Sequence, residues 1–115
     1  MLNFKNLKKK LIVAEVGLSY YGKLNNAFNL IEKVSNSGAD AIKFQTHYAD
    51  SESTVQEKFR KGHNFKFKNR YEYWKYHELS KDEWLKIKKH CRKKNILFSS
   101  SPFSVKSFKI LKTMG

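Results

Sequence analysis

The chain has 115 residues, of which 40% are hydrophobic and 15% aromatic, and it carries 24 Lys and Arg against 10 Asp and Glu, a formal net charge of +14. This composition excludes a disordered chain and allows one small domain with a modest core. The positive charge favours anionic partners such as phosphate esters, nucleic acid or an anionic membrane. Lysines spread along most of the chain are, however, equally typical of a coding bias.

Cysteine usage and hydropathy indicate the compartment. The single cysteine, Cys91, cannot form an internal disulfide, which fits a reducing environment. No apolar run approaches the roughly 20 residues of a membrane span. The apolar run at residues 11–16 follows a basic N-terminus, but Glu15 interrupts it before it could form the core of a signal peptide. We therefore expect a cytoplasmic protein that has no membrane partner.

The first predicted elements are a strand and a helix. Residues 11–17 form a near-continuous apolar run of the kind that buried parallel strands show. Glu15 is the exception, because a carboxylate in such a run is costly to bury unless it is paired or used. A helix should follow with Asn25 or Asn26 as its N-cap, and Gly38 is placed to end it in a left-handed conformation. Its predicted apolar stripe is Ala27, Leu30, Ile31 and Val34.

A second strand is predicted within residues 38–46, GADAIKFQT. Successive side chains of a strand point to opposite faces, so Lys43 and Gln45 share one face while Ile42 and Phe44 share the other. The apolar face can pack under a helix. The other face carries a cation and an amide at the C-terminal end of the strand, where barrels of parallel strands bind their substrates.

Residues 47–78 form a long connection without clear periodicity. It contains too many aromatic residues to remain in water, so we expect it to fold over another part of the protein and to include a short helix. These aromatic residues are Phe59, Phe65, Phe67, Tyr71, Tyr73, Trp74 and Tyr76.

The next helix has the clearest start signal in the sequence. Ser80 and Glu83 have the spacing of a capping box, and Leu79 with Trp84 supplies a hydrophobic staple. The buried stripe should consist of Trp84, Ile87 and Cys91.

A third strand and a last helix complete the pattern. The strand is predicted over residues 95–101, ended by Pro102, which cannot donate to a sheet ladder. Ser104 is a good N-cap for the last helix. The apolar stripe predicted for that helix is Val105, Phe108 and Leu111.

Three strands alternating with helices predict a parallel α/β sheet. A parallel sheet needs both faces covered, and a (βα)8 barrel takes about 250 residues. We therefore expect the chain to be the opening part of a larger fold.

The predicted strand ends bring Glu15, Lys43, Gln45 and Ser101 to one rim. Lysine and serine can bind a phosphate or carboxylate, glutamine can orient a hydroxyl, and glutamate can position or deprotonate a hydroxyl or water. This set predicts a site for a phosphorylated or acidic small molecule. The alternative is a buried, satisfied Glu15–Lys43 salt bridge with a purely structural role.

Three segments resemble the signature segments of the sialic acid synthase (N-acetylneuraminate synthase) family, which includes the legionaminic and pseudaminic acid synthases. They are residues 14–17 (AEVG), 38–46 (GADAIKFQT) and 100–103 (SSPF); residues 70–74 (RYEYW) also resemble one branch. The resemblance implies a TIM (βα)8 barrel. Residues 1–115 would then be the N-terminal portion of the catalytic barrel with its first three βα units, without the rest of the barrel or any antifreeze-like domain.

The resemblance also implies an activity, the condensation of phosphoenolpyruvate with N-acetylmannosamine or a related acylamino sugar to a nonulosonic acid and phosphate. Lys43 and Ser101 would bind the phosphate or carboxylate of phosphoenolpyruvate. Gln45 would lie beside the metal and the sugar, Phe103 would line the pocket, and Glu15 would form its floor. The catalytic candidates are Glu15, Lys43 and Gln45.

The family requires a divalent metal, usually manganese or magnesium, whose histidine ligands lie on later strands. We therefore expect no metal ligand in this chain, no turnover by the 115 residues alone, and a homodimer for the complete enzyme. One segment departs from the family, which usually has Asn-His-Asn-Gly or a His-Asp-Gly variant where this chain has Ser19-Tyr-Tyr-Gly22. Tyr20 and Tyr21 therefore replace polar residues near the site and leave the substrate preference open.

Other residues allow competing interpretations. The four histidines, His47, His63, His77 and His90, lack metal-ligand spacing and are predicted to be loop or surface residues. Cys91 is predicted to be a buried, inert thiol.

The cations and aromatics between Lys58 and Lys75 suit single-stranded nucleic acid, so a non-catalytic basic module binding an anionic partner is the main alternative function. We do not expect nucleic acid as the partner, because the sequence has no recognisable nucleic-acid-binding signature. A non-catalytic barrel half that serves in assembly is the third possibility.

Overall fold

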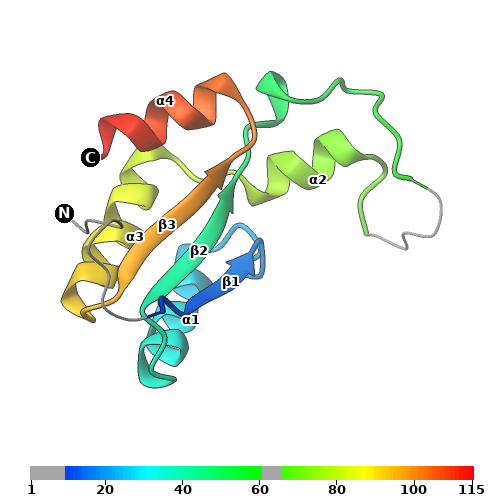
Figure 1. Ribbon diagram of the computed structural model, residues 1–115. Helices are drawn as coiled ribbons and strands as arrows, with labels where there is room; N and C mark the ends of the chain where they lie inside the picture. Colours follow the sequence, from blue (N-terminus) through cyan, green and yellow to red (C-terminus); the bar gives the residue numbers. More distant parts are fainter. Residues whose placement is uncertain (1–9, 61–65) are drawn as a thin grey trace.

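Three parallel strands form one sheet in the order β1-β2-β3, with β2 in the centre (Figure 1). The structure is a computed structural model that describes residues 10–60 and 66–115. Its elements are β1 (Val13–Gly17), α1 (Leu24–Asn36), β2 (Ala41–Thr46), the short 3-10 helix η2 (Ala49–Ser51), α2 (Arg70–His77), α3 (Lys81–Lys93), β3 (Leu97–Pro102) and α4 (Val105–Thr113). The predicted parallel α/β class is therefore confirmed.

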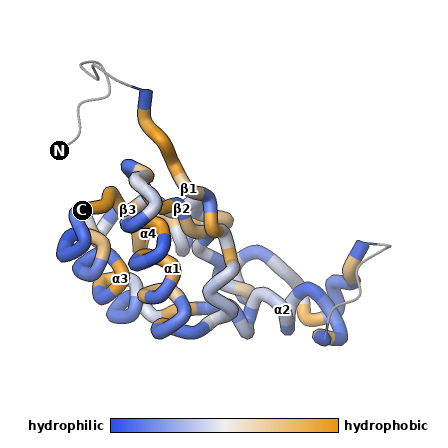
Figure 2. The backbone as a smooth tube through the Cα atoms, turned by 90° about the horizontal axis from the view of Figure 1, so that it is seen from below, coloured by the Kyte–Doolittle hydropathy of each residue, from blue (hydrophilic) through white to orange (hydrophobic). Residues whose placement is uncertain are grey.

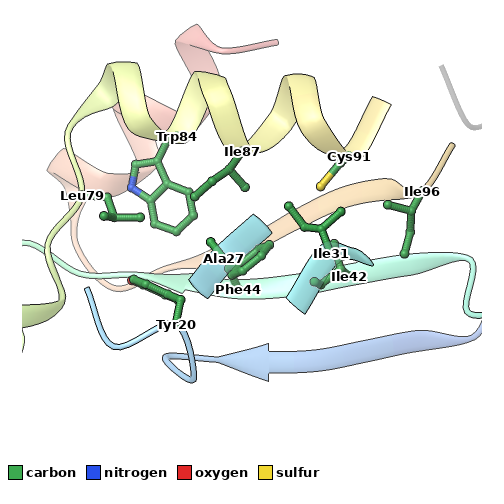
Figure 3. Close-up of a cluster of buried hydrophobic side chains, with 10 residues drawn as sticks. All are labelled: Tyr20, Ala27, Ile31, Ile42, Phe44, Leu79, Trp84, Ile87, Cys91 and Ile96. Atoms are coloured by element: carbon green, nitrogen blue, oxygen red, sulfur yellow. The ribbon is translucent and has the colours of Figure 1, made fainter. Parts of the chain in front are cut away.

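The core lies between the sheet and helices α1 and α3 (Figure 3). Ile42 and Phe44 of β2 are fully buried beneath it. The stripes predicted for α1 and α3 face this core, since Ala27 and Ile31 of α1 and all three α3 residues are buried. The core cluster consists of Tyr20, Ala27, Ile31, Ile42, Phe44, Leu79, Trp84, Ile87, Cys91 and Ile96.

The opposite face of the sheet is open to solvent. Val13 of β1 is 44% exposed and Leu97 of β3 is 37% exposed, although both lie within strands. Figure 2 shows the hydrophobic start of β1 standing apart from the helices. The strand alternation predicted for β2 places Lys43 and Gln45 on this open face, because the buried Ile42 and Phe44 take the helix side.

Helix α1 starts differently from the prediction. Its N-cap is Lys23 rather than Asn25 or Asn26, and the cap makes no side-chain hydrogen bond. The preceding loop sets the start, because Lys23 N donates to the carbonyl of Tyr20 at 3.0 Å. The amide of Asn26 is used in the same loop, donating to the same carbonyl at 3.2 Å. The predicted left-handed end of the helix is confirmed, with φ of +82° at Gly38.

Strand β3 includes Pro102, which was predicted to stop it. Pro102 pairs in register with Thr46. The missing N–H is tolerated because the next residue, Phe103, donates to the Thr46 carbonyl at 3.2 Å.

Helix α4 has the predicted cap but not the predicted core stripe. Ser104 is the N-cap and forms a capping box with Ser107. Val105 is 70% exposed and Phe108 is 52% exposed, while the small Ser107 is fully buried. The helix therefore packs through the side that carries Ser107 and leaves Val105 and Phe108 in solvent.

The long connection folds over the strand ends and contains the expected short helix, α2, whose N-cap Asn69 accepts a hydrogen bond from Glu72 N at 2.9 Å. Tyr73 is central to an aromatic cluster, with ring centroids 5.5 Å from Phe67 and 4.5 Å from His77. Phe65 and His63 lie outside the described residues. Among residues 10–60 and 66–115, no helix has the length and apolar character needed to cross a membrane.

Candidate functional site

A polar row runs along the open face of β2 towards its C-terminal end. Lys43 pairs in register with Glu15 of β1, and its ammonium lies 3.0 Å from a carboxylate oxygen of Glu15. The two side chains are 35% and 51% exposed, so the ion pair forms but is not buried. An exposed pair of this kind contributes little to stability and leaves both charges accessible to a ligand.

Gln45, the next residue of this row, is held on two sides. Its Oε1 lies 3.1 Å from Nε2 of His47. On the other side it lies over Gly17, where a Cβ would come within 3.5 Å of Gln45 Nε2. Gly17 has φ of +52° and lies at a register shift between β1 and β2, so the end of β1 passes close to the glutamine.

A cavity of about 330 Å³ opens beside Gln45. Loop residues after β1 form one wall, and aromatic rings of α2 form another. The lining residues are Leu18, Ser19, Tyr21, Gln45, Tyr73 and Trp74. Aromatic walls with one polar amide are typical of a small-molecule site that orients its ligand by a few hydrogen bonds.

His47 follows Gln45 at the next position of the row and is a functional candidate that was not among the predicted site residues. It lies in the loop after β2, as predicted, but it is 2% exposed and is therefore not a surface residue. Its ring stacks on Trp74 and on Phe103, with centroid distances of 4.1 Å to each. Its Nδ1 lies 2.5 Å from a carboxylate oxygen of Glu52. The same period-two alternation that grouped Lys43 with Gln45 could have found it.

The other described histidines also have structural partners. His77 is 1% exposed within the aromatic cluster, and burial lowers its pKa. His90 of α3 forms an ion pair with Glu32 of α1 at 2.8 Å. The surface prediction is therefore wrong for His77 as well.

Ser101 and Phe103 occupy different places relative to this row. Ser101 pairs in register with Gln45, one strand away. Phe103 lies against the ring of His47 and remains 48% exposed. Both stand at the same strand ends as Lys43 and Gln45, as predicted, while their roles remain predictions.

Tyr20 and Tyr21 take opposite positions. Tyr20 is fully buried, and its hydroxyl donates to the backbone carbonyls of His77 at 3.0 Å and Gln45 at 3.3 Å. Burial raises the pKa of its hydroxyl. Tyr21 is 61% exposed and lines the cavity. Only Tyr21 can therefore meet a ligand directly, while Tyr20 acts as a core residue beneath the site.

Two cations of the basic connection are engaged within the protein. Arg70 forms an ion pair with Glu57 at 2.9 Å and lies 5.4 Å from the ring centre of Trp74. Lys75 pairs with both Asp50 and Glu78 at 3.3 Å. These contacts fix α2 over the strand ends, which reduces what these two cations can offer to a nucleic acid.

The described parts of the chain contain no cluster of three or more His, Cys, Asp or Glu side chains that could hold a metal ion. The donor set at the rim, with a lysine at its centre, does not suit a divalent cation. No chemical step at this site is therefore assigned to a metal bound by these residues.

The fold is that of an α/β protein with a cavity and a polar row of side chains at the C-terminal ends of its parallel strands. Residues 30–115 match the NeuB family. The chain belongs to this family, whose named relatives include sialic, legionaminic and pseudaminic acid synthases.

Two relatives and one solved structure show the extent of the similarity. The N,N'-diacetyllegionaminic acid synthase of Campylobacter jejuni is 32% identical over 112 residues, covering 95% of this chain and 34% of the relative. The enzyme of that name from Legionella pneumophila is 33% identical over 107 residues, covering 90% and 30%. The crystal structure of N-acetylneuraminic acid (sialic acid) synthetase from Leptospira borgpetersenii, in complex with citrate, has a TM-score of 0.75 at 33% identity, covering 99% and 38%. The chain thus spans about a third of the length of these proteins.

Proposed function

We propose that residues 1–115 are the N-terminal portion of the catalytic (βα)8 barrel of a nonulosonic acid synthase, containing its first three βα units. The sequential strand order and the packing of α1 and α3 on one face of the sheet support this proposal. In a (βα)8 barrel the helices lie outside, and the inner face of each strand packs against side chains of the other strands. Exposed Val13 and Leu97 on the face opposite the helices fit this arrangement.

The proposed reaction joins phosphoenolpyruvate to N-acetylmannosamine or a related acylamino sugar, consumes one water molecule and releases inorganic phosphate. The observation that carries the proposal is the exposed Glu15–Lys43 pair, which lies beside Gln45 at the strand ends of a NeuB family chain. An accessible ammonium at this rim suits an anionic substrate.

Each rim residue has a role that follows from its chemistry. The ammonium of Lys43 would exchange its contact with Glu15 for the phosphate or carboxylate of phosphoenolpyruvate. Ser101 would donate its hydroxyl to the same anion, and Phe103 would line the pocket. The freed carboxylate of Glu15 could then hold a proton from a hydroxyl or water, and the amide of Gln45 would orient the sugar.

Three further properties belong to this proposal. A divalent manganese or magnesium ion would activate the sugar aldehyde in the complete enzyme, held by residues outside this chain. The complete enzyme would form a homodimer, and it would work in the cytoplasm.

The test is a phosphate-release assay on the synthase that carries these residues together with the remaining barrel strands. Phosphoenolpyruvate, N-acetylmannosamine and manganese should give phosphate, whereas the 115-residue chain alone should give none. Lys43→Ala should lower kcat/KM by about tenfold to about 150-fold, the range for loss of one hydrogen bond to a charged group. Lys109→Ala is the matched control, because Lys109 is an exposed cation on α4.

Two results would count against the proposal. Unchanged turnover in Lys43→Ala would remove Lys43 from the site. Absence of phosphate release from the complete protein, together with binding of single-stranded nucleic acid that depends on the aromatic residues of the basic connection, would instead favour the basic module.

A further inference from the structure

A second cavity, of about 490 Å³, opens on the solvent side of α1 and α3. The two helices lie side by side (Figure 2), and α3 turns Trp84, Ile87 and Cys91 towards the core. The lining residues come from the other sides of the helices and are Phe28, Lys86, Lys89, His90, Arg92 and Lys93. None of them belongs to the rim at the strand ends, so this cavity is a separate feature of the molecule.

Two stacked rings form the apolar part of this cavity. The ring of Phe28 lies 4.6 Å from that of His90, with 30° between the ring planes. Phe28 is partly buried and packs against the hydrophobic core, and His90 is held by Glu32 at 2.8 Å, so both rings are fixed in place. Flat side chains of this kind offer a surface on which a further flat ring can pack.

Four exposed cations of α3 surround these rings, Lys86, Lys89, Arg92 and Lys93. Lys86, Lys89 and Lys93 are three and four residues apart, so they lie along one side of the helix. Within residues 10–60 and 66–115, none of the four forms an ion pair. Arg92 and Lys93 lie in the last turn, where the helix dipole favours cations, but Lys86 and Lys89 lie in the middle of the helix and gain little from it.

The carboxylates of the two helices do not cancel this charge. Glu32 of α1 is shared by His90 and by Lys94, whose ammonium lies 2.7 Å from it. Glu83 of α3 is engaged at the N-terminus of the helix, where it accepts a hydrogen bond from Ser80 N at 2.8 Å. Asp82, in the first turn, opposes the positive charge only at the Lys86 end of the row. The cavity therefore has a local excess of positive charge, which attracts anions.

We propose that this cavity binds a nucleoside diphosphate, with the base packed on the Phe28 and His90 rings and the phosphates paired with the cations of α3. A simple inorganic anion would leave the rings in water, and an uncharged aromatic ligand would leave the cations without partners. A ligand that joins a flat ring to a phosphate chain uses both features, and the volume lies within the range of small-molecule sites. The proposal does not depend on the synthase reaction.

The experiment is a calorimetric titration of the unmodified chain with ADP and with pyrophosphate, two ligands of similar charge, without magnesium and at about 0.15 M salt. ADP should bind about two- to tenfold more tightly than pyrophosphate, because only ADP stacks on the rings. In amide NMR spectra, ADP should shift the signals of Phe28 and of residues 86–93. Equal affinities, or shifts at the strand ends instead, would overturn the proposal. Tighter binding of short single-stranded DNA through the same residues would also overturn it and assign the surface to nucleic acid.

Two variant pairs separate the rings from the charges. Phe28→Leu should lower the affinity for ADP to that for pyrophosphate and leave pyrophosphate binding unchanged, whereas Phe108→Leu, which alters an exposed ring of α4, should change neither. Lys89→Glu replaces an attraction by a repulsion and should weaken both ligands by about two- to thirtyfold. Lys109→Glu on α4 changes the net charge equally and is its control.

Equal weakening by Lys89→Glu and Lys109→Glu would show that only the overall charge attracts these anions, and would overturn the proposal. Unchanged ADP binding in Phe28→Leu would do the same for the base. Lys89 is an exposed helix residue, so its variant tests the site independently of any effect of Phe28→Leu on the packing of α1.

Discussion

Replacement of Gly22 by alanine tests how firmly the loop after β1 is seated against α2. Gly22 has φ of +65°, and a Cβ built on it would lie 2.0 Å from the backbone carbonyl oxygen of Tyr76 and 3.1 Å from its carbonyl carbon. Gly38 provides a matched control, since its φ is +82° and nothing lies within 4 Å of its Cβ position. The two glycines share the backbone strain and differ in the steric overlap.

The expected losses follow from these two terms. Left-handed backbone costs about 1–2 kcal/mol for alanine, which we expect for Gly38→Ala. Gly22→Ala adds a backbone overlap that only movement of the loop or of α2 can relieve, at about 1–3 kcal/mol more. The effect of alanine on the unfolded chain is the same at both positions, so it cancels in the comparison.

The measurement is urea unfolding followed by tryptophan fluorescence, with the free energy of unfolding of each variant compared with that of the parent chain. Gly22→Ala should be the less stable variant by at least about 1 kcal/mol. Equal losses for Gly22→Ala and Gly38→Ala would refute the reasoning, because they would show that the loop is not held against α2. The wall of the cavity that contains Tyr21 would then not be fixed either.

Three further predictions test which side chains belong to the hydrophobic core and how much they stabilise the fold. Tyr20→Phe removes a hydroxyl that donates to two backbone carbonyls, so it should lower the free energy of unfolding by about 1–3 kcal/mol. Tyr21→Phe should change this free energy little. Equal stability of the two variants would show that the Tyr20 hydroxyl does not stabilise the fold. Burial raises the pKa of the Cys91 thiol to about 12 from its ordinary value of 9.0, so the thiol of the folded chain should resist thiol reagents. The buried, protonated thiol stabilises the fold, and this contribution to the free energy of unfolding should be lost as the pH rises from about 9 to about 12. Rapid labelling of the native chain would show that Cys91 is accessible. Phe108→Ser should change the free energy of unfolding by less than about 0.5 kcal/mol because Phe108 is half exposed, while Ile87→Ala should lower it by about 2–5 kcal/mol. A large loss of stability in Phe108→Ser would show that Phe108 packs in the core, as the sequence predicted.

Local patterns in the sequence were sufficient for the elements whose signals lie within a few residues. The alternation along β2 correctly separated Ile42 and Phe44 from Lys43 and Gln45, because a strand has a fixed period of two. The Ser80 capping box was predictable for the same reason, since its two partners are three residues apart.

The errors occurred where contacts outside the helix itself decided the role of a residue. The amide of Asn26 was available as a helix cap, but the loop at Tyr20 uses it. Phe108 had helical spacing for burial, yet α4 packs through Ser107. A pattern along one helix shows that it has an apolar face, but the neighbouring elements decide which face they cover.

The sequence by itself determined the family, the parallel sheet and the rim that contains Glu15, Lys43 and Gln45, because each depends on residue types at fixed local spacing. Only the tertiary structure decided the environment of His47. Its partners come from the connection after β2, from α2 and from the end of β3, and their separation in the chain leaves no periodic signal. Packing of these three segments against one another, rather than local propensity, places the buried histidine behind Gln45.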